Sequence, residues 1–285
     1  MAYNDLLFNE GLPVPTFRGT NFRSGDLAEA TALLLLQQVA LVAPVPRTED
    51  VGIDAIVTLH REFDQHRLIA EDSLFVQIKS ASVDCVEYSA DEVKWLYELD
   101  LPLFYASFDM TSCQISLFCA QQIAEAFITD HDRKKLQVRF DGESNLLDIV
   151  GAADDIVRLG PPVMVWSMRE CSTDRKALRE NFYAVVKAHV QIQKKNIEFR
   201  GVGRVENYSW QPNEVPPDGT WKTTSTKPKG EILAEAYNRM MPYFSIWVME
   251  LPFAGDWEHA RDVISLMETA RLLCEQPNTD KILPM

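Results

Sequence analysis

The stretches VGIDAIVTLHREF (51–63) and DSLFVQIKSASV (72–83) decide the fold that this sequence predicts. Both are rich in β-branched and aromatic residues, which is typical of strands. The segment between them is short and polar, so we expect the two strands to form an antiparallel hairpin. Each run also contains polar residues that are costly to bury alone: Asp54 in the first, and Gln77 and Lys79 in the second. Their position inside a sheet indicates a site.

Strand geometry predicts how these residues are oriented. Successive side chains of a strand point to opposite faces, so Gln77 and Lys79 share one face, with their Cα atoms roughly 7 Å apart. Phe75 shares that face, and Leu74, Val76 and Ile78 face the other way. An antiparallel partner strand can bring Asp54 close to Gln77.

This combination suits phosphodiester hydrolysis, which needs a metal to polarise the phosphate and a cation to place water or balance charge. Mg²⁺ prefers oxygen ligands and needs only one or two carboxylates. We therefore expect Asp54, the Gln77 amide oxygen and the Ile78 backbone carbonyl to bind the metal. Lys79 would position or deprotonate the attacking water. Glu29, in a predicted helix, would support the metal or its water shell.

Each of these residues, taken alone, also has an ordinary structural interpretation. Asp54 can be a strand-end aspartate that is bonded to backbone. Lys79 can be a charge that protects a sheet edge from pairing. Glu29 can be an exposed helical glutamate. Asp50, just before the motif, can be an auxiliary ligand or a loop cap.

A helical Glu29, a strand Asp54 and the pair Gln77-x-Lys79 on the next strand together resemble the PD-(D/E)XK nuclease superfamily. The GxD and QxK pattern is similar to its Mrr-like branch. The text GDLAEATALLLL, EDVGIDAIV and FVQIKS, followed by a helix with Trp95 and the strand LPLFYASFD, is similar to an uncharacterised bacterial domain family placed there.

The resemblance implies a restriction-endonuclease-like fold, in which helices flank a mixed central sheet. It also implies an active site of Glu29, Asp54, Gln77 and Lys79 that uses Mg²⁺, with Mn²⁺ able to substitute. The implied function is a DNA endonuclease in bacterial defence against foreign DNA, acting as a homodimer. However, a glutamine replaces the second acidic residue of the commonest pattern, and a fold does not establish activity. The alternatives are a silent module that binds nucleic acid, or a protein partner through the acidic N-terminal half, and a nuclease that acts on RNA.

The rest of the chain predicts an α/β (α+β) protein with a mostly helical C-terminal region. The expected helices cover 25–40, 89–99, 121–128, 174–196, 231–241 and 256–275, and the further strands cover 101–110, 113–120, 136–142 and 162–168. We expect 198–210 to be extended and 211–230 to be a loop. The Gly160–Pro162 break divides a nuclease-like domain (1–160) from an α-rich region (161–285) that binds substrate or a partner.

Charge and composition limit the partners. The net charge is −14, so nucleic acid would have to bind a local basic patch rather than the mean field of the protein. The best candidate patch is Lys187, Lys194, Lys195, Arg200 and Arg204, although an ordinary solvated helix face explains it equally well. The loop with Lys222, Lys227 and Lys229 is a second candidate. We expect the tryptophans near the C-terminus to lie in the core rather than to stack on bases: Trp210, Trp221, Trp247 and Trp257.

The sequence has no apolar run long enough to span a membrane. It has no visible signal peptide. Its five cysteines are scattered, without a CxxC pair. These features predict a cytoplasmic protein with reduced thiols.

Overall fold

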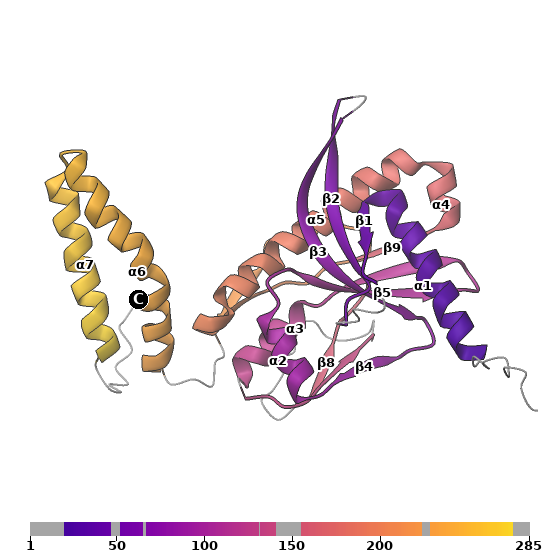
Figure 1. The fold of residues 1–285 in the computed structure, drawn as a ribbon, viewed down its shortest axis with the longest axis horizontal. Helices are drawn as coiled ribbons and strands as arrows, with labels where there is room; N and C mark the ends of the chain where they lie inside the picture. Colours follow the sequence, from indigo (N-terminus) through magenta and orange to yellow (C-terminus); the bar gives the residue numbers. More distant parts are fainter. Residues whose placement is uncertain are drawn as a thin grey trace, which may run out of the picture.

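The computed structural model describes residues 20–46, 52–64, 67–130, 132–140, 155–223 and 229–275. It confirms a mixed α/β protein with a helical C-terminal region (Figure 1). The helices are α1 (Thr20–Val39), α2 (Ala90–Glu98), α3 (Gln121–Thr129), α4 (Met168–Thr173), α5 (Arg175–Phe199), α6 (Lys229–Phe253) and α7 (Trp257–Glu275), with a 3₁₀ turn η2 (Arg200–Val202).

The central sheet has six strands in the order β1-β2-β3-β5-β6-β9. Their bounds are Leu41–Pro44 (β1), Ala55–Asp64 (β2), Arg67–Ser80 (β3), Leu103–Asp109 (β5), Gln114–Cys119 (β6) and Met164–Ser167 (β9). Strands β2 and β3 form the predicted antiparallel hairpin. Strands β3 and β5 are parallel, because the chain crosses over through α2 between them, and the other neighbours are antiparallel.

Each face of this sheet has its own apolar core. On one face, Val76 and Ile78 of β3 belong to the core that includes residues of α1 and α5. On the other face, Phe75 of β3 and Tyr105 of β5 pack with residues of α2 and α3. We call these the α1 face and the α2 face. The alternation along β3 therefore places Gln77 and Lys79 on the α2 face, together with Phe75.

The α2 face is covered in part by a small second sheet that sequence analysis did not predict. Its strands are β4 (Cys85–Tyr88), β7 (Leu136–Arg139) and β8 (Ile156–Arg158) in the order β4-β7-β8. The expected strand over 136–142 is thus β7, which pairs with β4 and not with the central sheet. The pairing partners are four and three residues long, too short to leave a clear periodic signal.

The core continues past the Gly160–Pro162 break. Strand β9 pairs with β6, and its Trp166 is fully buried with Phe182 of α5 in the core of the α1 face. Residues on both sides of the predicted boundary at 160 therefore share one core. The expected extended segment 198–210 is wrong in its first part, because α5 continues to Phe199 and a 3₁₀ turn follows.

The segment 211–230 is also not entirely loop. Strand β11 (Thr220–Thr223) pairs antiparallel with β10 (Arg204–Asn207). Lys227 lies outside the described residues. For Lys222 and Lys229 only the backbone is described, and not the side chain.

The last two helices form an antiparallel hairpin that stands away from the sheet (Figure 1). Helix α6 continues to Phe253, well beyond the predicted end at 241, and contains Pro242 and Pro252. A proline removes one backbone donor and favours a break, but packing of α6 along α7 holds the helix together. No helix in the described ranges is both long and apolar enough to cross a membrane.

Candidate functional site

The site begins at Gly52, two residues before Asp54. Gly52 has a φ of +79°, a conformation that side chains other than glycine rarely adopt. A Cβ at this position would also lie 3.3 Å from the Trp95 ring of α2. Glycine is therefore needed where the chain turns into β2. Asp50, predicted as an auxiliary ligand or cap, lies outside the described residues.

Asp54 is fixed between two strands by its backbone. Its N–H donates to the Val76 carbonyl at 3.0 Å, and its carbonyl accepts from the Val45 N–H at 2.9 Å. The carboxylate Oδ2 accepts a hydrogen bond from the Ile78 N–H at 2.5 Å. The backbone interpretation of Asp54 is thus realised for one oxygen, but a carboxylate has several lone pairs and can also bind a cation.

Asp54 lies just before β2 and beside the part of β3 that carries Gln77. The β2–β3 ladder begins with Ala55 opposite Val76. Asp54 precedes this pair, with its N–H bonded to Val76 and its carboxylate bonded to Ile78, the residues on either side of Gln77. Lys79 follows Gln77 by two residues on the same face of β3. The N–H and C=O of a strand residue point the same way, so the Ile78 carbonyl is directed toward the side where its N–H meets Asp54.

A pair of tyrosines holds Gln77 in place, and neither was predicted from the sequence. The Tyr88 hydroxyl of β4 donates to Gln77 Oε1 at 2.7 Å, and the Tyr105 hydroxyl lies 2.8 Å from that of Tyr88. Burial raises the pKa of Tyr88 to about 12, and the negative charges of Glu92 and Asp54 contribute to the rise. Tyr88 therefore stays protonated and keeps donating to Gln77. No sequence pattern links β4 to β3, so no signal was available to find this contact.

Lys79 differs from the other lysines that the sequence singled out. It is half-buried at the end of β3. Among the described residues, its side chain has no hydrogen bond and no ion pair, whereas its backbone belongs to the β3–β5 ladder. An ammonium group without such a partner is available to interact with an anion.

Glu29 lies on the other side of the sheet layer. It is half-buried on α1, at the border of a stripe formed by Ala28, Ala32 and Leu35 that packs on the α1 face. Gln77 and Lys79 project on the α2 face, and the Asp54 carboxylate meets the β3 backbone at Ile78. Glu29 could therefore reach the cluster only around the ends of the strands, and its supporting role stays a prediction.

The donor set fits a hard divalent cation. A carboxylate, an amide oxygen and a backbone carbonyl are ligand types that Mg²⁺ accepts, with waters completing its shell. Gln77 Oε1 has two lone pairs, so the bond from Tyr88 leaves one for a metal. The described residues contain no group of three or more His, Cys, Asp and Glu side chains that could hold a metal ion. Any metal bound here would depend on the Asp54 carboxylate and neutral oxygens.

The five predicted phosphate-binding residues do not form one open basic surface. Lys187 and Lys194 pair with Glu71 and Asp72 of β3. Lys195 pairs with Glu206 at 3.2 Å.

The two arginines lie farther along the chain. The Arg200 guanidinium donates to the Leu99 carbonyl at 3.0 Å and lies over the Tyr97 ring. Arg204 is exposed at the start of β10. Sequence reasoning could not detect these contacts, because they join residues that are far apart in the chain.

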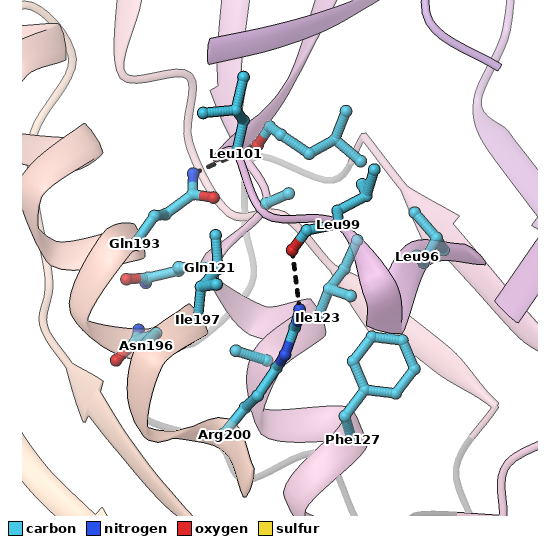
Figure 2. A pocket seen from close by; sticks show the side chains of 13 residues that line it. Leu96, Leu99, Leu101, Gln121, Ile123, Phe127, Gln193, Asn196, Ile197 and Arg200 are labelled. Atoms are coloured by element: carbon cyan, nitrogen blue, oxygen red, sulfur yellow. Dashed lines mark hydrogen bonds between the residues drawn. The ribbon is translucent and has the colours of Figure 1, made fainter. Parts of the chain in front are cut away.

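A small cavity lies where α2, α3 and α5 meet. Figure 2 shows Gln193, Asn196 and Arg200 of the α5 region and Phe127 of α3 around it. Its volume is about 40 Å³, which holds a few water molecules. Its lining is mostly apolar and contains no carboxylate, so the candidate site stays at Asp54, Gln77 and Lys79.

Comparison with protein-family models, with characterised proteins and with solved structures finds no match to this chain. The function is therefore inferred from the arrangement of Asp54, Gln77 and Lys79 and from the resemblance of the sequence to the PD-(D/E)XK pattern.

Proposed function

We propose that this chain is a metal-dependent endonuclease with a restriction-endonuclease-like fold, which hydrolyses phosphodiester bonds of DNA. The observation that supports the proposal is the contact of Asp54 with β3: its carboxylate accepts from the N–H of Ile78, the residue between Gln77 and Lys79. Gln77 and Lys79 share one face of β3, and the Lys79 ammonium has no partner among the described residues. Carboxylate, amide and lysine at these positions match the PD-(D/E)XK pattern that the sequence resembles.

The residues have separate roles in this proposal. Asp54, Gln77 and the Ile78 carbonyl would hold Mg²⁺, which supplies charge neutralisation at the phosphate and a more acidic bound water. Lys79 would hold the attacking water or balance the negative charge that develops on the phosphate. Tyr88 is a positioning residue, because its hydroxyl fixes the orientation of the Gln77 amide.

The proposed cellular role is defence against foreign DNA in the cytoplasm. The resemblance to Mrr-like proteins motivates the role. The described cysteines Cys85, Cys113, Cys119 and Cys171 are all free thiols, as expected in a reducing compartment.

A second candidate function is a catalytically silent module with the same fold that binds a protein partner or nucleic acid. Two contacts favour it: one Asp54 oxygen already accepts from Ile78, and the Gln77 oxygen already accepts from Tyr88. A single carboxylate also binds a cation more weakly than two.

Plasmid nicking distinguishes the two functions. We expect wild-type protein to nick supercoiled DNA with Mg²⁺ or Mn²⁺, and Asp54→Ala to lose about 100-fold or more of that rate. The matched control is Glu87→Ala, an exposed carboxylate on β4, which should keep the wild-type rate. Equal nicking by wild type and Asp54→Ala would identify a contaminating nuclease.

A calorimetric titration with Mn²⁺ completes this test. The nuclease proposal predicts heat of binding in wild type that is lost in Asp54→Ala. No binding and no nicking by the wild type would favour the silent module. A single-stranded RNA substrate in the same assay separates DNA-directed from RNA-directed cleavage.

A further inference from the structure

The C-terminal half of α6 has an apolar face that nothing in the described structure covers. In its first half, α6 rests on the main body: Arg239 donates to the Glu198 carbonyl and, together with Glu235, packs over Gly201. Helix α7 covers the opposite side, where Phe244 is buried. Figure 1 shows one end of α6 beside the body and the other end standing away from it, next to α7.

The residues that continue the body-facing side are large and apolar. From Arg239, steps of three and four residues reach Pro242, Ile246, Met249 and Phe253, which therefore form one stripe. Ile246, Met249 and Phe253 are 55%, 64% and 88% exposed.

Two further aromatic residues flank the stripe. Tyr243 is 67% exposed and Trp247 is 54% exposed. The expectation that Trp247 lies in the core is therefore wrong, and so is that for Trp257, which is 64% exposed at the start of α7. Their sequence context is apolar, but the hairpin has only two helices and cannot enclose them.

We propose that this face, defined as Pro242, Tyr243, Ile246, Trp247, Met249 and Phe253, is the contact surface for a second copy of this chain. The two α6 helices pack antiparallel across a two-fold axis, so that the two hairpins form a four-helix assembly. This inference does not depend on the proposed nuclease activity.

The pattern of the face is self-complementary. In a two-fold antiparallel pairing centred between residues 247 and 248, Ile246 of one copy meets Met249 of the other, and Pro242 meets Phe253. The small proline thus faces the most exposed of these apolar side chains. Glu250 is the only charged residue between 240 and 253 in the sequence, and this register places it opposite Ser245 and not opposite its own copy. No like charges are brought together at the centre.

The exposed area fits a weak dimer. Aromatic side chains bury roughly 150–250 Å² each, so the five exposed side chains contribute on the order of 600 Å² per copy. Specific interfaces bury about 800 Å² per partner, and smaller ones are transient. We therefore expect dissociation in the micromolar range.

Charge argues against the main alternative occupants. Residues 229–275 contain eight acidic and four basic residues, a net charge of −4. A negative surface repels nucleic acid and anionic lipid. A second copy carries the same net charge, but within the face itself Glu250 is the only charged residue, so the contact brings little charge together.

Sedimentation equilibrium of the full chain between about 1 and 100 µM tests the proposal across the concentration range of a weak interface. Wild type should shift from monomer to dimer, and Ile246→Asp should raise the dissociation constant at least about tenfold, because a carboxylate would be desolvated at the centre of the contact. Leu266→Asp is the matched control, since Leu266 is 53% exposed on α7 and lies outside the face. It should dimerise like wild type.

Cross-linking tests the orientation. A mixture of Ile246→Cys and Met249→Cys chains should form a disulfide between the two variants, in preference to links within either variant alone. A wild-type monomer throughout the range, a dimer unaffected by Ile246→Asp, or equal loss with Leu266→Asp would each overturn the proposal.

Discussion

The end of β3 and the solvent-facing side of α5 both carry lysines, but the structure treats them differently. Lys79 lies half-buried on β3, on the same face as Gln77, and its side chain has no ion-pair partner among the described residues. Lys187 and Lys194 of α5 are paired with Glu71 and Asp72, at the other end of the same strand. A lysine without an ion-pair partner is therefore a better candidate for binding an anionic substrate than a lysine whose charge is already neutralised by a neighbouring acid.

Replacing Lys79 or Lys187 by methionine tests whether the two lysines differ in their effect on DNA cleavage. We predict that Lys79→Met lowers the nicking rate about 100-fold or more, because charge stabilisation at the reacting phosphate is lost. Lys187→Met removes only a surface ion pair and should change the rate about fivefold or less, the equivalent of ~1 kcal/mol. Nicking rates at saturating Mn²⁺ measure both, and a larger loss in Lys187→Met than in Lys79→Met would reverse the assignment.

A second prediction tests the turn that positions Asp54 against this strand. Gly52→Ala should lower the free energy of unfolding by about 1–3 kcal/mol, because alanine is strained at a φ of +79° and its Cβ approaches Trp95. Urea denaturation measures the change.

The matched control is Gly25→Ala in α1, where an added Cβ meets no atom within 4 Å. It should stabilise the protein by about 0.5–1 kcal/mol, since alanine is the better helix former. Equal effects at both positions would show that the turn at Gly52 is not strained by a side chain.

The predictable part of the molecule was the part governed by local periodicity. Alternation along 74–80 correctly separated Gln77 and Lys79 from Ile78, which belongs to the opposite core. The β2–β3 hairpin followed from two strand-like runs and a short connection. The Ser89–Glu92 capping box is present, with the Glu92 carboxylate accepting from the Ser89 backbone N–H.

The part that could not be predicted depends on contacts between distant segments. Tyr88 reaches Gln77 only because a short strand folds over the α2 face, and nothing in the sequence near residue 88 points to residue 77. The ion pairs of α5 with β3 are equally non-local. Helix α6 continues through Pro242, although proline favours a helix break, and its packing along α7 accounts for this.

A third prediction concerns the role of residue 77 in metal binding. Gln77→Glu should tighten Mn²⁺ binding about tenfold, because a second carboxylate adds ligand charge. Tyr88 can still donate to the new carboxylate, so the local structure should persist. Calorimetric titration measures the dissociation constant. Unchanged or weaker binding would mean that residue 77 is not a metal ligand.

A fourth prediction concerns the ion pair of Glu71 with Lys187 of α5 and the dependence of stability on pH. The hydrogen bond from Lys187, with further bonds from Tyr183 and Arg61, lowers the pKa of Glu71 to about 2 from its ordinary 4.5. Because the pKa is lower in the folded protein, the contribution of Glu71 to stability is complete above about pH 4.5 and is lost as the pH falls toward 2.

Urea midpoints measured at several pH values across this window test the prediction. Glu71→Gln should make the midpoint less dependent on pH, and Lys187→Met should do so more weakly. The same change at the exposed Glu180 serves as the control. An unchanged profile in Glu71→Gln would mean that Glu71 and Lys187 are not paired in solution.

The proposed nuclease chemistry requires Asp54 and Gln77 to bind a divalent metal beside Lys79. Anomalous diffraction from crystals soaked in Mn²⁺ shows whether they do. We expect one strong peak within coordination reach of the Asp54 carboxylate, the Gln77 amide oxygen and the Ile78 carbonyl, and no peak there in Asp54→Ala crystals. A fully soaked crystal with no peak at Asp54, or with the metal bound only elsewhere, would rule out this metal site.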